Sequence, residues 1–323
     1  NSFLAATGVF TFLVLSGFII SKVYHNKILN IKQLFEFYRK RFFRMYPLHL
    51  LFLIIFLIVE FLRLYIETNY LISVNSEAFT INNLKTFFSH FFLINIFNNV
   101  LTFNAPAWTV SGEFLASIFF GIVSIFFLKD SKKFNFLLLS TFIIVIIFLF
   151  FQKKLTQYNT IFALLSVIFC FIIGFFCFRI QQSRNKLFFT LLNKNIQILN
   201  LILFIILINF KILDFLVPIC SGIIIIYLSD IKKNNFFEKI FFNNFLIFKD
   251  KISYTLYISH YFVYWVYTQV FRHVLKIESL DSFNNTLFIE NNLIIYLTKI
   301  FLSFITVYFI SHILYNKFEK RFI

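Results

Sequence analysis

Proline, glycine and cysteine are scarce in this 323-residue chain, which contains 3 Pro, 6 Gly and 3 Cys. No stretch rich in Pro, Gly or Ser divides the sequence, and no segment of roughly 20–50 residues repeats. A single domain covering residues 1–323 is therefore the simplest organisation. Cys170, Cys177 and Cys220 lie within apolar segments and lack Cys-x-x-Cys spacing, so we interpret them as packing residues. We predict no metal site and no permanently bound cofactor.

Acidic residues are also few, because 14 Asp and Glu stand against 30 Lys and Arg, for a net charge of +16. In a soluble protein such an excess would favour nucleic acid as the partner. Here 60% of the residues are hydrophobic, and no basic patch has readable nucleic-acid geometry. Membrane proteins concentrate Lys and Arg in their cytoplasmic loops. We therefore attribute the charge to membrane topology and predict no nucleic-acid partner.

Apolar runs of about twenty residues recur along the chain, and each is long enough to cross the bilayer as a helix. The predicted fold class is therefore all-α, a polytopic membrane helix bundle. The nine predicted spans are Phe3–Ile20, Leu48–Leu64, Phe114–Leu128, Phe134–Phe151, Thr160–Phe178, Ile196–Phe210, Ile212–Leu228, Ile252–Val270 and Leu293–Tyr315. A tenth apolar patch, Thr86–Phe97, is short and is predicted to be re-entrant or interfacial.

The predicted spans divide the loops into two alternating sets, one for each side of the membrane. The set that begins with Ser21–Met45 contains 22 Lys and Arg, and the other set contains 6. The first set is therefore predicted to be cytoplasmic, in a multi-pass protein of the inner (cytoplasmic) membrane. Residue 1 then lies outside, an unusual start that predicts an N-terminally incomplete chain. The longest outer loop, Arg63–Glu113, is the natural place for an outward-facing pocket.

Four cations lie within Tyr38–Leu48, immediately before the second predicted span. Apolar residues at helical spacing in Ile31–Met45 predict an amphipathic helix at the inner interface. Its predicted apolar face consists of Ile31, Leu34, Phe35, Tyr38, Phe42 and Met45. Arg41 and Arg44 lie near the boundary of its two faces, where two guanidinium groups could hold the phosphates of a coenzyme A thioester. The alternative is a topological anchor that contacts lipid phosphates.

Trp108, Ser111 and Glu113 stand at the predicted outer mouth of the third span. A carboxylate at the head of a membrane helix, beside a hydroxyl, can act as a general base or orient one. Equally, Ser111 and Glu113 fit helix-start residues, for which the helix dipole favours an acid.

The segment Ile252–Tyr261 places Ser253, Tyr257 and His260 on one helical face, which is predicted to line a protein-filled or water-filled interior. A lone His such as His260 is more typical of a hydrogen-bonded core residue than of a catalyst. Glu60 and Arg63, three residues apart, are predicted to form a structural ion pair.

Five stretches, in order along nearly the whole chain, resemble motifs of the acyltransferase family 3 of integral membrane O-acyltransferases. They are Phe10–Ile20 (FFxLSGFLI), Arg41–Pro47 (RxxR-x-x-P), Trp108–Glu113 (WSLSxE), Ile252–His260 (ISYSLYLxH) and Phe318–Phe322 (IExPF). The resemblance implies a ten-helix bundle that moves an acyl group, usually acetyl, from cytoplasmic acyl-coenzyme A to a hydroxyl of a surface or lipid-linked glycan.

The resemblance also implies roles for individual residues. Arg41 and Arg44 would bind the donor, acetyl-coenzyme A or another acyl-coenzyme A, while Ser111 and Glu113 would form the catalytic centre across the membrane. Members of the family carry an earlier helix with a basic residue and a His regarded as the catalytic base. This chain begins after that helix, so either an incomplete copy or an inactive truncated relative is expected.

Trp108, Tyr257 and His260 would contact the acceptor, so the expected partners are acyl-coenzyme A, a glycan or lipid-linked sugar, and the lipid bilayer. An alternative from another class is a glycan transporter or flippase whose path is lined by Ser253–His260. Loss of bound acyl-coenzyme A on substitution of Arg41 and Arg44 would separate the two, because a flippase needs no such donor.

Overall fold

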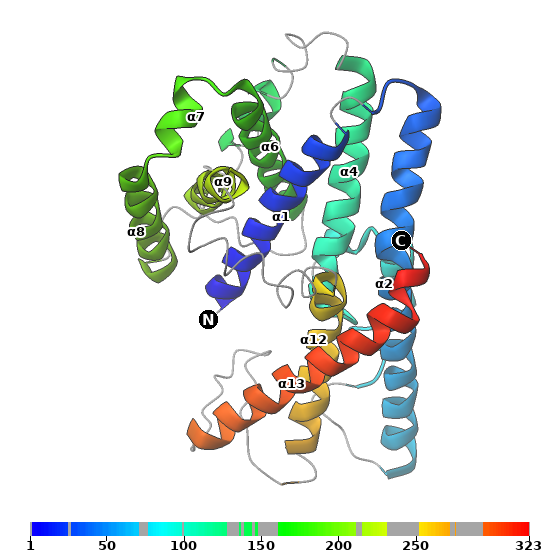
Figure 1. Ribbon diagram of the computed structural model, residues 1–323. Helices are drawn as coiled ribbons and strands as arrows, with labels where there is room; N and C mark the ends of the chain where they lie inside the picture. Colours follow the sequence, from blue (N-terminus) through cyan, green and yellow to red (C-terminus); the bar gives the residue numbers. More distant parts are fainter. Residues whose placement is uncertain are drawn as a thin grey trace. The chain divides into compact units, whose positions relative to one another are not determined.

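The computed structural model describes residues 2–24, 27–70, 77–98, 100–127, 136, 139–143, 146–147, 161–210, 215–230, 252–271, 275 and 293–322. Every regular element in these ranges is helical, which confirms the all-α prediction (Figure 1). The α-helices are α1 (Ser2–Tyr24), α2 (Ile31–Tyr70), α3 (Leu84–Phe91), α4 (Trp108–Phe127), α6 (Ile161–Ser183), α7 (Lys186–Leu191), α8 (Lys194–Phe210), α9 (Leu216–Ser229), α12 (Ser253–Gln269) and α13 (Leu293–Lys317). Short 3-10 turns are η1 (Asn95–Phe97), η2 (Ala105–Ala107) and η5 (Glu319–Arg321).

Five helical stretches in the described ranges are long and apolar enough to cross a membrane, and most predicted spans coincide with helices. The five are Ala6–Tyr24, Ile31–Tyr70, Ala105–Ile125, Ile161–Ser183 and Leu297–Arg321. Helices α8 and α9 are shorter apolar helices, and α12 has 17 residues. The predicted span Phe134–Phe151 lies for the most part outside the described residues. The patch Thr86–Phe97 overlaps α3 and contains η1, and both elements are too short to span.

Contacts group the chain into two compact units. Unit 1 comprises Asn1–Phe42, Phe88–Leu101 and Trp108–Phe241. Unit 2 comprises Phe43–Phe87, Thr102–Ala107 and Phe242–Ile323. Helix α2 contributes its first residues to unit 1 and the remainder to unit 2. The expectation of one domain over residues 1–323 stays a prediction.

In unit 1, the backbones of α1 and α6 come into direct contact (Figure 1). A Cβ atom added to Gly17 would lie 2.5 Å from the carbonyl oxygen of Phe171, and one added to Gly174 would overlap the carbonyl oxygen of Val14. Small residues allow membrane helices to approach this closely, because no side chain separates them. The two glycines therefore allow the close contact between α1 and α6.

The first part of α2 packs against α4, also within unit 1. The Tyr38 hydroxyl donates a 2.8 Å hydrogen bond to the carbonyl of Ile118. A Cβ atom on Gly121 would lie only 2.7 Å from the Tyr38 ring, and the rings of Phe42 and Phe114 are 5.9 Å apart. These contacts make the two helices antiparallel neighbours. They also place the start of α4 beside the cationic stretch of α2.

The predicted amphipathic helix at residues 31–45 is not a separate element, because α2 is one helix of 40 residues with Pro47 inside it. Its predicted apolar face is also partly wrong. Ile31 and Phe35 are 65% and 67% exposed, whereas Phe37, which was not assigned to that face, is 1% exposed. Phe37 is buried because it packs edge-on against Tyr24, with ring centroids 4.7 Å apart. The side of the helix that faces the core therefore differs only in part from the predicted one, because Leu34 and Tyr38 do pack against the core.

In unit 2, α12 and α13 are held together by polar contacts between antiparallel helices. These are Ser259 Oγ to Ser311 Oγ at 3.1 Å, the Tyr267 hydroxyl to Thr306 Oγ1 at 2.8 Å, and the Lys299 amine over the Tyr264 ring at 4.8 Å. Hydroxyl groups that bond across helices stabilise packing in membranes, where apolar side chains provide no selective attraction. Serine, threonine and tyrosine thus define which faces of these two helices meet.

Glu60 on α2 anchors the chain that follows the helix in unit 2. Its carboxylate, 3% exposed, accepts hydrogen bonds from Arg63 (2.9 and 3.2 Å), from the Asn82 amide (2.6 Å) and from the Phe79 backbone (3.2 Å). The predicted Glu60–Arg63 pair is therefore confirmed. Asn82 in turn accepts a 2.6 Å bond from the backbone of Phe103, so two loop segments are tied to α2.

Gly174→Ala should destabilise the protein by about 1–3 kcal/mol, because its Cβ would meet backbone atoms of α1 that cannot swing aside. Gly8→Ala is the matched control, since no atom lies within 4 Å of its Cβ position. That substitution should be neutral or raise stability by roughly 0.5–1 kcal/mol. Thermal unfolding of both variants in one detergent measures the difference, and equal midpoints would contradict the close α1–α6 contact.

Candidate functional site

Arg41 and Glu113, both predicted site residues, form an ion pair in unit 1. Arg41 Nη2 donates to Glu113 Oε1, and the two side chains are only 11% and 9% exposed. The pairing follows from the contact between α2 and α4, in which Tyr38 lies beside Ile118. Charge neutralisation within the pair offsets the cost of removing both groups from solvent.

Arg41 retains one further donor beyond this ion pair. Its Nε atom is buried and has no hydrogen-bond partner within the described part of the chain. A buried N–H without an acceptor costs about 1–3 kcal/mol. A carbonyl, phosphate or oxyanion oxygen placed against Nε would remove that cost. The Arg41–Glu113 pair is thus a neutralised site with an unsatisfied donor at Nε.

Ser111 and Trp108 lie on the first turns of α4, in the same unit as the ion pair. Ser111 is fully buried, and its Oγ accepts a 3.0 Å hydrogen bond from the backbone N–H of Ile96 in η1. The hydroxyl can still donate its own hydrogen. Trp108, the first residue of α4, is 7% exposed and belongs to the core of unit 1. Unit 1 therefore gathers Arg41, Ser111, Glu113 and Trp108.

The predicted separation of Arg41 from Glu113 across the membrane is wrong. Direct contact between the two side chains places them at one level of unit 1. The reason is that α4 packs along the first part of α2, which the sequence had assigned to the inner interface. The alternative prediction, that Glu113 is an acid at the start of a helix, is also wrong, because the first turn of α4 contains no acidic residue.

The remaining predicted residues, Arg44, Tyr257 and His260, belong to unit 2. The Tyr257 hydroxyl donates to the Pro106 carbonyl at 3.2 Å, and His260 Nδ1 is hydrogen-bonded to the carbonyl of Tyr257. Because a carbonyl can only accept, Nδ1 carries the hydrogen, and in the neutral imidazole Nε2 is then an acceptor. His260 and Ser253 are exposed, and Tyr257 is half-buried.

Arg44 is exposed on α2. Unit 2 also contains a buried carboxylate that the sequence analysis did not select, Glu319. Glu319 is 4% exposed and accepts a hydrogen bond from Thr255 Oγ1. The sequence contained one signal that could have identified Glu319, namely an acid directly after the last apolar helix, within the stretch Phe318–Phe322. Arg41 thus forms an ion pair with Glu113, while Glu319 is bound by Thr255.

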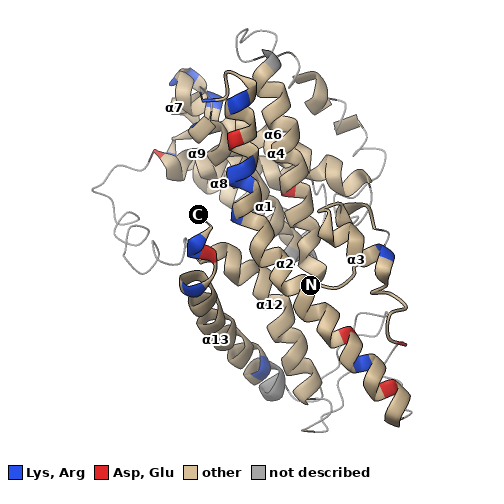
Figure 2. Cartoon of the chain, turned by 90° about the vertical axis from the view of Figure 1, so that its right-hand side faces the viewer, with Lys and Arg blue, Asp and Glu red and all other residues tan. Residues whose placement is uncertain are grey.

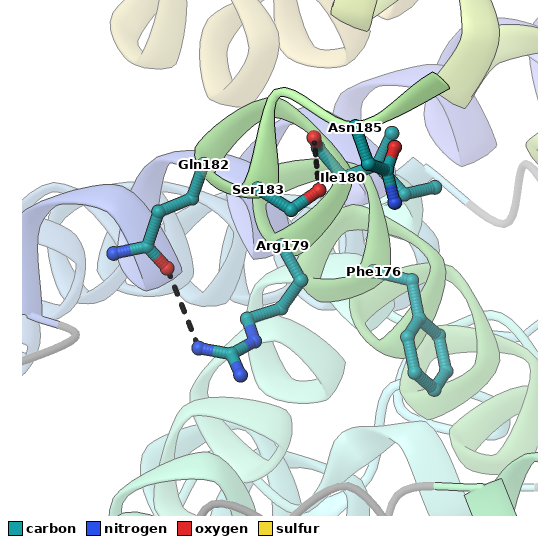
Figure 3. Close-up of a pocket in the computed structure, with 6 residues that line it drawn as sticks. All are labelled: Phe176, Arg179, Ile180, Gln182, Ser183 and Asn185. Carbon is teal, nitrogen blue, oxygen red and sulfur yellow. Dashed lines mark hydrogen bonds between the residues drawn. The ribbon is translucent and has the colours of Figure 1, made fainter. Parts of the chain in front are cut away.

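A separate cleft of 410 Å³ lies at the end of α6 in unit 1 (Figure 3). It is lined by Phe176, Arg179, Ile180, Gln182, Ser183 and Asn185. Basic side chains gather around the neighbouring α7 (Figure 2), and among them Arg184 pairs with Asp230 at 3.2 Å. None of the predicted site residues lines this cleft. Within the described ranges, no three His, Cys, Asp or Glu side chains are arranged as metal ligands.

The fold and the site define the class of this protein, which is a polytopic helical protein with a buried Arg–Glu pair. A family model described as an acyltransferase domain matches residues 1–314. The chain therefore belongs to this acyltransferase family, which confirms the resemblance seen in the sequence. Together with the apolar helices, membership indicates a multi-pass membrane protein. No curated protein and no solved structure matches the chain.

Arg41→Ala should destabilise unit 1 by about 3–5 kcal/mol, because Glu113 would remain buried without its counter-charge. Lys40→Ala is the matched control on the same helix, since the Lys40–Glu36 pair is solvent-exposed on both sides. The control should leave the unfolding midpoint nearly unchanged. Thermal unfolding of the two variants compares them directly, and similar midpoints would show that the ion pair contributes little.

Proposed function

We propose that this acyltransferase is an O-acyltransferase that moves an acyl group, acetyl in the simplest case, from cytoplasmic acyl-coenzyme A to a hydroxyl of a surface or lipid-linked glycan. The observation that carries the proposal is the buried Arg41–Glu113 pair with its unsatisfied Nε donor. Family membership supports acyl transfer as the reaction. A cytoplasmic donor and the basic loops fit a place in the inner membrane.

The reaction requires a site for a developing negative charge. When the acceptor hydroxyl attacks the thioester carbonyl, that carbonyl oxygen becomes an oxyanion, and the C–S bond then breaks to release the thiolate of coenzyme A. A preorganised, buried N–H stabilises such an oxygen strongly, because no solvent has to reorganise. Arg41 Nε has these properties. Transfer either proceeds directly or passes through an acyl-enzyme.

The other residues divide between donor and acceptor. The exposed guanidinium of Arg44 suits the phosphates of the donor, since its planar fork matches phosphate oxygens. Glu113 acts as the general base itself or orients another group that does so. The Ser111 hydroxyl belongs to the same unit. On the acceptor side, His260 Nε2 can accept a hydrogen bond from a sugar hydroxyl, and Tyr257 lies on the same helix, α12. Trp108 as an acceptor contact stays a prediction from the sequence.

Arg44→Ala and Glu113→Ala should each abolish acetylation of the glycan in cells that produce the complete protein. The first substitution removes the guanidinium that binds the phosphates of the donor, and the second removes the carboxylate from the reaction centre. Arg39→Ala, an exposed cation on the same stretch of α2, serves as the control and should leave acetylation intact. Acetyl ester on isolated glycan is measured by mass spectrometry or proton NMR. Wild-type ester levels in both test variants would contradict the roles assigned to Arg44 and Glu113.

A further inference from the structure

The last turns of α6 present a face that combines apolar, cationic and hydroxyl side chains. Arg179, Ile180 and Ser183 come three, four and seven residues after Phe176, so all four side chains lie on the same side of the helix. They line the cleft of 410 Å³ at the end of α6 (Figure 3). This volume falls within the range of small-molecule sites, about 300–1,000 Å³. The cleft therefore suits a group with an apolar part and an anionic part.

Arg179 brings a guanidinium group to this cleft. Its side chain is half-buried, and its Nη1 donates to Gln182 Oε1 at 3.3 Å, which orients one side of the planar group. Among the described residues Arg179 forms no ion pair, so no neighbouring acid neutralises its charge there. A guanidinium matches phosphate oxygens with parallel N–H groups. Arg179 is therefore suited to bind a phosphate in the cleft.

The chain around the cleft is cationic. From Arg179 to Lys194 the sequence contains four Lys and Arg and no Asp or Glu. Arg184 is paired with Asp230 at 3.2 Å, whereas Lys186 and Lys194 are exposed (Figure 2). Cations close to a membrane surface attract anionic lipids. The charge at this end of α6 is thus complementary to an anion.

The cleft belongs to the level of the lipid headgroups. Helix α6 is long and apolar enough to span the membrane and ends at Ser183, and a spanning helix of this length ends at the membrane surface. The next helix, α7, has six residues and is too short to span. Its Leu187 and Phe189 are 49% and 59% exposed. Exposed apolar side chains beside cations are typical of a helix that lies in the interface.

We propose that this cleft binds the phosphate group of an anionic phospholipid, with Arg179 as its principal ligand. The guanidinium donates to the phosphate oxygens, while Phe176 and Ile180 contact the apolar part of the lipid. A phospholipid fits better than a soluble phosphate compound, because the cleft has apolar walls and lies where the headgroups are. The inference goes beyond the proposed function and does not depend on it, since none of the residues assigned to acyl transfer lines the cleft.

Lipid titration followed by native mass spectrometry tests the inference on the full-length protein in detergent, because the mass resolves each bound lipid. Phosphatidylglycerol is the anionic probe, and phosphatidylcholine, whose choline cation balances its phosphate, is the neutral one. The first phosphatidylglycerol should bind roughly tenfold more tightly than the first phosphatidylcholine. Arg179→Ala should weaken binding of phosphatidylglycerol about tenfold, as expected for the loss of a hydrogen bond between charged groups. Arg39→Ala, which removes an exposed cation of α2, should leave this Kd unchanged.

Two substitutions that each introduce one negative charge distinguish a defined site from general attraction. Ser183 lines the cleft, whereas Thr190 on α7 does not. They are otherwise matched, because both are exposed and each hydroxyl donates to a carbonyl of its own helix, at 3.0 and 2.8 Å. Ser183→Glu should abolish the preference for phosphatidylglycerol, since its carboxylate repels the phosphate and pairs with Arg179. Thr190→Glu should retain most of the preference.

Several outcomes would overturn the inference. Equal affinity for the two lipids, an unchanged Kd in Arg179→Ala, or equal losses in Ser183→Glu and Thr190→Glu would each show that the cleft does not select the anionic lipid. Inorganic phosphate and acetyl-coenzyme A, added in excess to the lipid-bound protein, should leave the lipid in place. Displacement of the lipid by either competitor would show that the cleft takes a soluble phosphate compound and would overturn the assignment to a phospholipid.

Discussion

The ion pair between Arg41 and Glu113 fixes the register of α2 against α4, and much of unit 1 depends on that register. With Arg41 opposite Glu113, Tyr38 reaches the Ile118 carbonyl, and the start of α4 brings Ser111 to the backbone of Ile96. A shift by one turn would separate the two charges while both stay buried, and breaking a buried pair costs about 3–5 kcal/mol. Apolar residues make the two helices compatible with the membrane, but the charged pair determines how they align.

Much of the helical fold could be predicted from apolar runs, because helices alone satisfy backbone groups in lipid. Helix faces were harder to predict. In a soluble helix, the contrast between apolar and polar sides marks the core, but here Ile31 and Phe35 are exposed while Phe37 is buried, and all three are apolar. The residue types of the site were readable from motifs, yet the contact between Arg41 and Glu113 was not. It depends on which part of the long α2 lies against α4, and hydropathy does not contain that information.

Unit 2 shows how hydroxyl and carboxylate groups select partners among otherwise similar helices. Ser259 with Ser311 and Tyr267 with Thr306 connect α12 to α13, while Glu60 gathers the loop segments that follow α2. Each contact satisfies a polar group that would be costly to leave alone in an apolar environment. The result is a set of polar side chains whose positions are fixed by hydrogen bonds to other parts of unit 2. Rigid surroundings of this kind favour sites in which reacting groups must be held in place.

The scarcity of glycine acquires a further meaning once its positions are known. Of the six glycines, only Gly8 has open space around its Cβ position, and the other five lie where an added Cβ would approach a neighbouring helix or side chain to 3.0 Å or less. Glycine codons are rich in G and C, whereas the codons for the abundant Phe, Ile, Asn and Lys are rich in A and T. A genome that drifts toward A and T would lose glycines first where nothing requires them. The few that persist in such a gene can therefore serve as markers of helix contacts, even where no structure has been determined.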